Sequence, residues 1–352
     1  MTRLQAESGH DGAASPAHGR EEPLLRVSDL VQEFVLGGQG KFSGRVVQAV
    51  SGVSLELGQG EVLAIVGETG SGKSTLARAI MQTPRPKSGS VVFKGIELGE
   101  LDRSELRRVR RQIQMIFQDP FSSLNPKLKV RQLIADPIVA RKELSRDARG
   151  LRVEEVLQLV ELEPAVYADR RPGQLSGGQC QRVAIARALA VSPELLICDE
   201  PVSALDVMVQ AGILNLFESL RATLGLSYLF ISHDLAVVRR VSDRVAVMYL
   251  GRLCEVAPAD QIFEHPRHHY TAALMSAIPK LARNAGSDGK ERLALRLDGD
   301  PPSALDPPSG CRFRTRCPAA RDRCAAEVPE LREISPAQWV ACHFPAGVPT
   351  EQ

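Results

Sequence analysis

The amino-acid sequence predicts an α/β fold with a mainly parallel β-sheet that helices cover on both faces. Three apolar runs rich in Val, Ile and Leu have the composition of buried strands: residues 61–66 (EVLAIV), 193–201 (PELLICDEP) and 226–234 (LSYLFISHD). The first run is followed by a glycine-rich turn and the amphipathic stretch STLARAIMQ, which gives the order strand, loop, helix. Apolar strands that alternate with helices favour a parallel sheet between helical layers.

The segments around these strands predict a tail, a helical stretch, a hairpin and a linker. We expect ordered structure to begin near Leu24, because the preceding residues contain no apolar run and are typical of a disordered tail. Residues 120–190 are expected to be largely helical, and residues 241–256 (VSDRVAVMYLGRLCEV) are expected to form a β-hairpin. After Pro279 the composition shifts to Gly, Asp and Pro, which is typical of a linker ahead of a small tail that carries cysteines.

Length and composition describe an ordinary globular protein. The 352 residues are 43% hydrophobic and 24% charged, which is enough apolar material for a full core. A net charge of +2 argues against a dominant role in binding polyanions. No stretch approaches the roughly 18 apolar residues that a membrane span needs, and the N-terminus has no signal-peptide core. We therefore expect a cytosolic protein whose cysteines are reduced thiols or metal ligands.

A phosphate-binding loop is predicted between the first buried strand and its helix. The segment GETGSGKST matches the pattern G-x-x-x-x-G-K-[ST], and this setting makes a chance glycine-rich turn a poor explanation. Glycines let backbone N–H groups surround phosphates, and the start of the helix adds the positive end of a dipole. Lys73 is placed to reach the β- and γ-phosphates, and the Ser74 hydroxyl is placed to bind Mg²⁺. The predicted nucleotide-binding residues are Gly67, Glu68, Thr69, Gly70, Ser71, Gly72, Lys73, Ser74 and Thr75.

Two acidic residues end the second buried strand, in the segment LLICDE. Asp199 is placed to hold Mg²⁺, and Glu200 is placed to polarise the water that attacks the γ-phosphate. By itself such a pair is more often a solvated acidic turn, but its position after an apolar strand and downstream of a phosphate loop favours the catalytic role. The sequence therefore predicts a site that hydrolyses a nucleoside triphosphate.

The segment LSGGQ at residues 175–179 distinguishes among the many classes of phosphate-loop protein. Together with the following QRVAIARALA, it resembles the signature motif of ATP-binding cassette (ABC) proteins. The resemblance covers about residues 24–345 and implies a RecA-like P-loop core, an antiparallel β subdomain and a helical subdomain at about 120–190. It also implies that two cassettes pair head to tail, so that the signature of one closes the ATP of the other. The signature residues are Ser176, Gly177, Gly178 and Gln179, whose glycines and helix start suit a phosphate.

Other motifs of the ABC family follow in the expected order. Gln118 in MIFQDP resembles the glutamine that contacts Mg²⁺ or water and relays the nucleotide state to a membrane partner. Asp206 in SALD resembles the residue that crosses the cassette interface, and His233 in ISHD resembles the histidine that hydrogen-bonds the γ-phosphate. Phe34 is placed like the aromatic residue that stacks on adenine, although a core Phe near a strand end explains it equally well.

Three longer segments resemble the ATP-binding subunits of bacterial dipeptide and oligopeptide importers: FQDPFSSLNP, EPVSALDVMVQAGILNLF and IFEHPRHHYTAALMSAIP. The insert after Phe34 is similar to that of the F-type subunit, one of two paralogous ATPases in such importers. The resemblance implies a tail at 1–22, a nucleotide-binding domain at 23–280, a linker at 281–310 and a C-terminal extension at 311–346.

The same resemblance implies a working context and leaves the substrate open. It implies ATP-driven import at the cytoplasmic face of the cell membrane, with ATP and Mg²⁺ as cofactors. The expected partners are a second ATPase subunit, two transmembrane permease subunits and an extracytoplasmic solute-binding protein. Peptides are the favoured substrate, but importers of nickel and glutathione use similar ATPases.

The alternative function is a soluble ABC ATPase that acts on nucleic acid or ribosomes. DNA-repair members insert a very long coiled coil between the two ATP motifs, and the interval from Lys73 to Asp199 is too short for one. Ribosome-acting members carry two cassettes in one chain, and this chain has one. The arginine run at residues 103–112 suits a solvated face better than a nucleic-acid site, so no nucleic-acid partner is expected.

Four of the seven cysteines lie near the C-terminus, at Cys311, Cys317, Cys324 and Cys342. Their spacing matches neither zinc ribbons nor bacterial ferredoxins, yet four thiols suffice to bind one metal centre. A [4Fe–4S] cluster is the favoured hypothesis, with zinc and unligated thiols as alternatives, because nearby arginines would offset the negative charge of a cluster. Those arginines are Arg312, Arg314, Arg316, Arg321 and Arg323.

A histidine cluster gives a weaker indication of a metal site. The segment EHPRHHY brings His265, His268 and His269 close together in sequence. The docking segment of the importer subfamily is enough to explain these residues, so metal binding is not the favoured interpretation.

Overall fold

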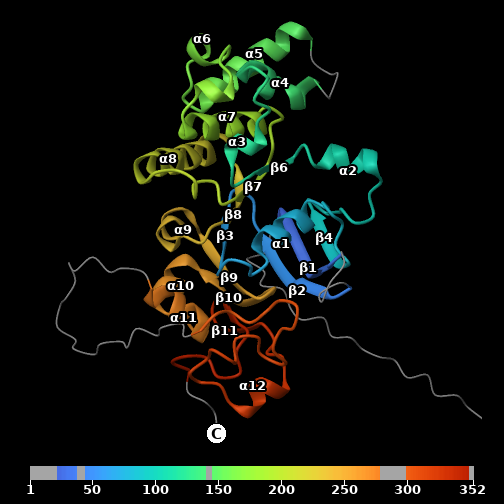
Figure 1. Cartoon of the computed structure of the whole chain (residues 1–352), viewed down its shortest axis with the longest axis vertical. Coiled ribbons are helices and arrows are strands. Elements are labelled where there is room, and N and C mark those ends of the chain that lie inside the picture. Colours follow the sequence, from blue (N-terminus) through green and yellow to red (C-terminus); the bar gives the residue numbers. More distant parts are fainter. Residues whose placement is uncertain (1–21, 38–43, 140–144, 278–298, 349–352) are drawn as a thin grey trace, which may run out of the picture.

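The structure, a computed structural model, describes residues 22–37, 44–139, 145–277 and 299–348. Figure 1 shows two sheets near the middle of the molecule, a group of helices at one end and the C-terminal segment at the other. The strands are β1 (Leu25–Val35), β2 (Val46–Leu57), β3 (Val62–Val66), β4 (Ser88–Phe93), β5 (Ile96–Glu97), β6 (Ile113–Ile116), β7 (Leu195–Asp199), β8 (Ser227–Ile231), β9 (Arg244–Tyr249), β10 (Arg252–Pro258), β11 (Arg332–Ser335) and β12 (Gln338–Val340). The helices are α1 (Lys73–Ile80), α2 (Arg103–Val109), α3 (Pro120–Ser123), α4 (Val130–Val139), α5 (Arg146–Leu159), α6 (Pro164–Tyr167), α7 (Gly177–Leu189), α8 (Val207–Leu224), α9 (Leu235–Val241), α10 (Ala259–Glu264), α11 (His269–Ser276) and α12 (Asp322–Ala326), with a 3₁₀ turn at Pro172–Gln174.

The larger sheet has eight strands in the order β11-β12-β10-β9-β3-β8-β7-β6. Strands β9, β3, β8, β7 and β6 are parallel neighbours, and every residue of β3, β7 and β8 is buried. Continuous burial explains why these strands are unbroken apolar runs in the sequence, since helices cover both faces of a parallel sheet. The prediction of a mainly parallel α/β fold is confirmed, as is the hairpin at residues 241–256, which forms β9 and β10.

The smaller sheet is antiparallel, in the order β2-β1-β4-β5. Its inner face packs on α1 and on β3 in one core that includes Leu25, Val53, Leu76 and Ile80. Helices α3 to α7 form the separate layer near β6 in Figure 1, with a core of their own that continues onto β7 and α8. Both features agree with the expected antiparallel and helical subdomains.

The C-terminal segment joins the larger sheet instead of standing apart from it. Strand β12 pairs with β10, where Glu255 faces Val340 and Val256 faces Trp339. The buried carboxylate of Glu255 accepts hydrogen bonds from the backbone N–H of His268 (2.8 Å) and from the side chain of Gln338 (2.8 Å). The segment therefore depends on the main sheet for its core. Most of the predicted tail at residues 1–22 and residues 281–298 of the predicted linker lie outside the described residues.

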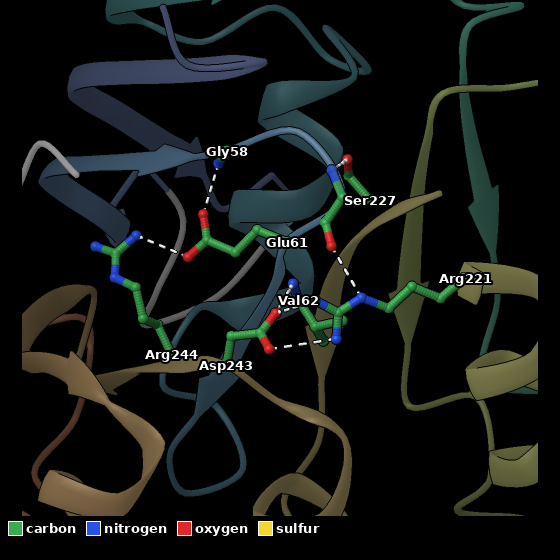
Figure 2. Close-up of polar contacts among 8 residues, drawn as sticks. Gly58, Glu61, Val62, Arg221, Ser227, Asp243 and Arg244 are labelled. Atoms are coloured by element: carbon green, nitrogen blue, oxygen red, sulfur yellow. Dashed lines mark hydrogen bonds and ion pairs between the residues drawn. The ribbon is translucent and has the colours of Figure 1, made fainter. Parts of the chain in front are cut away.

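Ion pairs and hydrogen bonds hold the amino ends of β3, β8 and β9 together (Figure 2), and the contact to β8 is the hydrogen bond from the Gly60 N–H to the Ser227 hydroxyl (2.8 Å). Asp243 accepts from the backbone N–H of Val62 (2.8 Å) and from the Arg221 guanidinium (2.7 Å). Arg244 donates to the Glu61 carboxylate at 3.0 Å. This network lies at the edge opposite the phosphate loop, which follows the carboxyl end of β3, so we assign it to the framework of the sheet.

The helices of the described segments include none that is long and apolar enough to cross a membrane.

Candidate nucleotide-binding and hydrolysis site

The segment after β3 forms a tight loop that ends at the first turn of α1. Gly67 has φ of 154°, and a Cβ there would lie 2.1 Å from the carbonyl oxygen of Met248. Gly72 has φ of 104°, and a Cβ there would lie 2.1 Å from the carbonyl oxygen of Ala49. The loop is therefore held at both ends against neighbouring backbone, which only glycine permits.

Lys73, the first residue of α1, lies across this loop. Its ammonium donates hydrogen bonds to the carbonyl oxygens of Gly67 (2.8 Å) and Glu68 (2.9 Å). Burial lowers the pKa of Lys73, and the carboxylates of Glu200 and Asp199 oppose this effect. A buried cation inside a loop of backbone N–H groups is an arrangement that attracts phosphate.

Ser74 and Asp199 form the part of the site that offers oxygen ligands. The Ser74 hydroxyl donates to Oδ1 of Asp199 at 2.8 Å, which joins the start of α1 to the end of β7. Burial raises the pKa of Asp199, whereas the hydrogen bond from Ser74 lowers it. A hydroxyl beside a carboxylate is a donor set that suits Mg²⁺.

Glu200 lies next to Asp199 and is the centre of a second hydrogen-bonded group. Gln118 donates from its side-chain amide to Oε2 of Glu200 at 2.8 Å, and Nδ1 of His233 lies 3.1 Å from Oε1. The backbone of Glu200 has φ of 50°, a left-handed conformation that is unusual for a residue with a side chain. Its N–H donates to the carbonyl oxygen of Ile231, which fixes this conformation between β7 and β8. Three residues far apart in sequence thus meet at one carboxylate.

The predicted signature residues lie at the start of α7. The Ser176 hydroxyl accepts from the backbone N–H of Gln179 (3.3 Å), and Oε1 of Gln179 accepts from the N–H of Ser176 (3.0 Å). This reciprocal capping box begins α7 at Gly177 by satisfying two backbone N–H groups at the helix start. Within the described parts of the chain, no hydrogen bond joins these residues to the phosphate loop, and α7 lies apart from α1 in Figure 1.

Two other predicted residues, Asp206 and Phe34, lie at the surface. Asp206 caps α8 by accepting from the N–H of Val209 at 3.0 Å. The first two residues of that helix, Val207 and Met208, expose 78% and 84% of their area. Phe34 is 40% exposed on β1, so it is not the core residue that the alternative interpretation required. All of these apolar side chains are available to a ligand or partner.

Contacts that the sequence does not predict reach the phosphate loop from the C-terminal half of the chain. The Tyr270 hydroxyl accepts from the backbone N–H of Glu68 at 2.9 Å. Arg316 donates to both carboxylate oxygens of Glu68, at 2.8 and 3.1 Å. Nothing in a single sequence relates residue 316 to residue 68, because only the fold brings them together.

Burial raises the pKa of three of the four C-terminal cysteines, Cys311, Cys317 and Cys342. The pKa of Cys342 rises to about 12, first through burial and then through the neighbouring thiols Cys311, Cys317 and Cys324. Among the described residues, however, no three His, Cys, Asp or Glu side chains are grouped to hold a metal ion.

Two of the arginines near these cysteines, Arg312 and Arg316, bind groups of the main body of the fold. Arg312 binds the backbone of Leu250 and the side chain of Gln48 (2.6 Å), and Arg316 binds Glu68. The expectation that all five arginines offset a cluster's charge is therefore wrong for these two, because carbonyl and carboxylate oxygens of the main body attract them.

The histidine cluster has structural partners. Nδ1 of His268 accepts from the N–H of Tyr270 at 3.1 Å and caps α11, while Nε2 of His269 lies 2.9 Å from the carbonyl oxygen of Phe344. Burial lowers the pKa of His268 to about 3, so its ring is neutral. The ring contacts therefore give His268 and His269 structural roles.

Comparison with known proteins places these features in a family. A family model described as ABC transporter matches residues 50–203, and one described as the C-terminal region of oligopeptide/dipeptide transporters matches residues 254–324. The chain is 46% identical over 327 residues to the oligopeptide transport ATP-binding protein AppF of Bacillus subtilis, covering 92% of this chain and 98% of AppF. It is also 46% identical over 323 residues to the di/tripeptide transport ATP-binding protein DppF of Pseudomonas aeruginosa, with the same coverage.

Solved structures agree with these relatives. The ABC transporter component cbiO1 of Clostridium perfringens has a TM-score of 0.61 and 30% identity, over 70% of this chain and 92% of cbiO1. The ATP-binding cassette MJ0796, in a dimeric post-hydrolysis state with ADP and Pi, has a TM-score of 0.59 and 31% identity, over 67% of this chain and 98% of that one. The chain is therefore an ATPase of the ABC transporter family, in the group that carries the oligopeptide/dipeptide transporter C-terminal region.

Proposed function

We propose that this chain is the ATP-hydrolysing subunit of an importer for dipeptides and oligopeptides. The observation that carries the proposal is the group at Glu200, where Gln118 and His233 both contact a carboxylate beside the Ser74–Asp199 pair. The names of the relatives AppF and DppF support peptides as the imported solute. The family membership favours transport over the alternative of an ABC ATPase that acts on nucleic acid or ribosomes.

Each residue of the site has a proposed part in hydrolysis. Lys73 leaves its carbonyl partners and binds the β- and γ-phosphates, while Glu200 accepts a proton from the attacking water. His233 binds the γ-phosphate, and Gln118 orients the water or the metal ligands. Ser74, Gln118 and Asp199 would hold Mg²⁺, which supplies charge neutralisation to the phosphates. Phe34 stacks on the adenine, and its exposed ring is free to do so.

We infer that two cassettes pair to complete each site. The signature residues from Ser176 to Gln179 lie at a helix start that is distant from their own phosphate loop, which supports their use by a partner cassette. Asp206 is followed by the exposed pair Val207 and Met208, a surface that suits contact with that partner. The proposed assembly adds two permease subunits and an extracytoplasmic binding protein, and works at the cytoplasmic face of the membrane.

Glu200→Gln tests the hydrolysis site. In the assembled transporter, we expect the variant to lose at least about 100-fold in single-turnover hydrolysis at its own site, because a positioned base contributes roughly 10²–10⁴-fold. ATP binding should persist, since glutamine keeps the size of the side chain. The control is Glu218→Gln, an exposed carboxylate that pairs with Arg240. Unchanged hydrolysis in Glu200→Gln would refute the general-base assignment.

The importer assignment has its own test. We expect the tagged chain to co-purify from membranes with two permease subunits and a second ATPase, and its ATPase rate to rise with binding protein and peptide. Sedimentation with ribosomes, or tight binding to DNA in the absence of any membrane partner, would refute the importer and favour the alternative.

The metal at the cysteines is a separate proposal. A [4Fe–4S] cluster held by Cys311, Cys317, Cys324 and Cys342 is favoured, with zinc and unligated thiols as alternatives. In the part of the chain that the structure describes, their side chains do not form a metal-holding group, so no step of hydrolysis is assigned to it. An anaerobic preparation with iron and absorbance near roughly 400 nm would support the cluster, and stoichiometric zinc without iron would refute it.

A further inference from the structure

A buried ion pair connects the C-terminal extension to the phosphate loop. The Arg316 guanidinium donates to both oxygens of the Glu68 carboxylate, and it also donates to the Tyr249 hydroxyl at 3.3 Å. The side chain of Arg316 is only 6% exposed, and that of Glu68 is 22% exposed. Bidentate guanidinium–carboxylate pairs of this kind fix position as well as charge.

The segment that carries Arg316 packs against aromatic residues, one of which contacts the phosphate loop. Phe313 is 2% exposed, and its ring lies 5.4 Å from that of Tyr249 and 5.3 Å from that of Tyr270. Tyr270 in turn accepts from the N–H of Glu68. One aromatic cluster therefore holds both the segment and the backbone of the loop at Glu68.

A second arginine, Arg312, contacts the turn between β9 and β10, and this turn binds the phosphate loop at Ser71. Arg312 donates to the carbonyl oxygen of Leu250 and to the Ser51 hydroxyl at 3.0 Å. The next residue, Gly251, donates its N–H to the carbonyl oxygen of Ser71 at 2.8 Å. The segment 312–316 thus contacts the loop directly at Glu68 and through the turn between β9 and β10 at Ser71.

Glu68 places a carboxylate within the predicted phosphate loop. The Lys73 ammonium donates to the backbone carbonyl of Glu68 at 2.9 Å, and the Glu68 carboxylate acts to raise the pKa of that ammonium, so the carboxylate would also act on phosphates that Lys73 binds. An unpaired carboxylate there would repel a triphosphate, and Coulomb interactions weaken only slowly over such distances when groups are poorly solvated. Although burial opposes it, the hydrogen bonds to Glu68 and Tyr249 raise the pKa of Arg316, which stays charged.

We propose that Arg316 is a positioning residue for nucleotide binding: the C-terminal extension holds the phosphate loop in its binding shape and neutralises Glu68 beside the phosphates. The inference rests on the proposed ATP site at Gly67–Thr75 and deepens it. It gives the extension a function in ATP affinity that does not depend on what the four cysteines bind.

The test measures binding of the Mg²⁺ complex of a non-hydrolysable ATP analogue to the purified full chain by calorimetry. Arg316→Ala should raise the Kd about tenfold, within the roughly 5–150-fold range of coupled sites. Arg316→Lys keeps the charge without the two-pronged contact and should fall between wild type and alanine. Adding Glu68→Gln to Arg316→Ala should restore most of the affinity, because it removes the uncompensated carboxylate. The control is Arg323→Ala, which loses an exposed pair with Glu327 in the same extension.

Steady-state ATPase of the assembled transporter gives the second readout. Arg316→Ala should raise KM for ATP and leave kcat near wild type, because Gln118, Glu200 and His233 keep their contacts. A merely structural role would lower the melting temperature and the active fraction without this split.

Four outcomes would count against the inference. Wild-type affinity in Arg316→Ala would do so, as would a double variant that binds no better than the single one. If Arg316→Ala does not fold, the binding affinities of Arg316→Lys and Glu68→Gln test the inference in its place. Weaker binding by Glu68→Gln than by wild type would overturn the electrostatic explanation. Absence of binding by the wild-type chain would instead refute the proposed ATP site, and the inference with it.

Discussion

Phe313→Ala is the most direct test of how the C-terminal extension is attached. The ring is 2% exposed and packs among Tyr249, Tyr270 and His268, with centroid distances of 5.4, 5.3 and 5.8 Å. Truncation of a buried Phe costs about 3–5 kcal/mol, which combines the lost transfer energy and the cavity that remains. The upper half of that range is expected, because each aromatic pair adds about 0.5–1.5 kcal/mol beyond the buried area.

The single tryptophan of the chain makes this loss measurable at the right place. Trp339 lies on β12 where the extension pairs with β10, so its fluorescence reports on that junction during urea unfolding. Circular dichroism of the same samples reports on the whole chain. The control is Phe121→Ala, whose ring is 50% exposed and whose loss should cost less than about 1 kcal/mol. If the Trp339 transition moves no further in Phe313→Ala than in the control, the ring does not anchor the extension.

Two further predictions concern neighbouring residues. His268 has a pKa of about 3 in the fold against 6.5 in the unfolded chain, so the unfolded state takes up the proton first. Stability should therefore fall as pH drops from 6.5 towards 3, by up to about 1.4 kcal/mol per pH unit, and urea titrations of His268→Asn, which keeps a capping oxygen, should show a shallower slope. Gly310→Ala should cost about 2 kcal/mol or more, because φ is 62° and the new Cβ would lie 2.3 Å from the carbonyl oxygen of Cys324. Gly225→Ala, with φ of 65° and open space around it, should cost only about 1 kcal/mol, and equal melting temperatures for the two variants would refute the steric argument.

The parts of the fold that the sequence could predict are those that depend on local pattern. Strands β3, β7 and β8 are continuous apolar runs because both of their faces are buried, and that pattern is visible in one dimension. The phosphate loop was equally visible, since its glycines are required by backbone contacts with Ala49 and Met248. The roles of Gln118 and His233 follow only from the family resemblance, and their contacts with Glu200 are not predictable from local pattern, because the three side chains come from separate strand ends.

The C-terminal extension is harder to predict because its residues contact partners that are distant in sequence. Arginines that lie beside cysteines in the sequence suggest a role at those cysteines. Arg312 and Arg316 instead bind groups that precede them by over 200 residues. Strands β11 and β12 are short and partly exposed, and they carry too little periodicity to distinguish them from a loop. Their pairing with β10 is determined by the register of Glu255 and Val256, which no local pattern reveals.

The contacts of Arg312, Phe313 and Arg316 give the cysteine-rich segment a connection to the phosphate loop in addition to its thiols. Cys311 and Cys317 flank the five residues that contain Arg312, Phe313 and Arg316, so the two thiols and the contacts with the phosphate loop share one short segment. The burial that raises the pKa of both thiols argues against their acting as free nucleophiles at neutral pH. A structural role for the cysteines and a role for Arg316 in nucleotide affinity are therefore compatible, and the affinity measurements on Arg316 variants separate the second from the first.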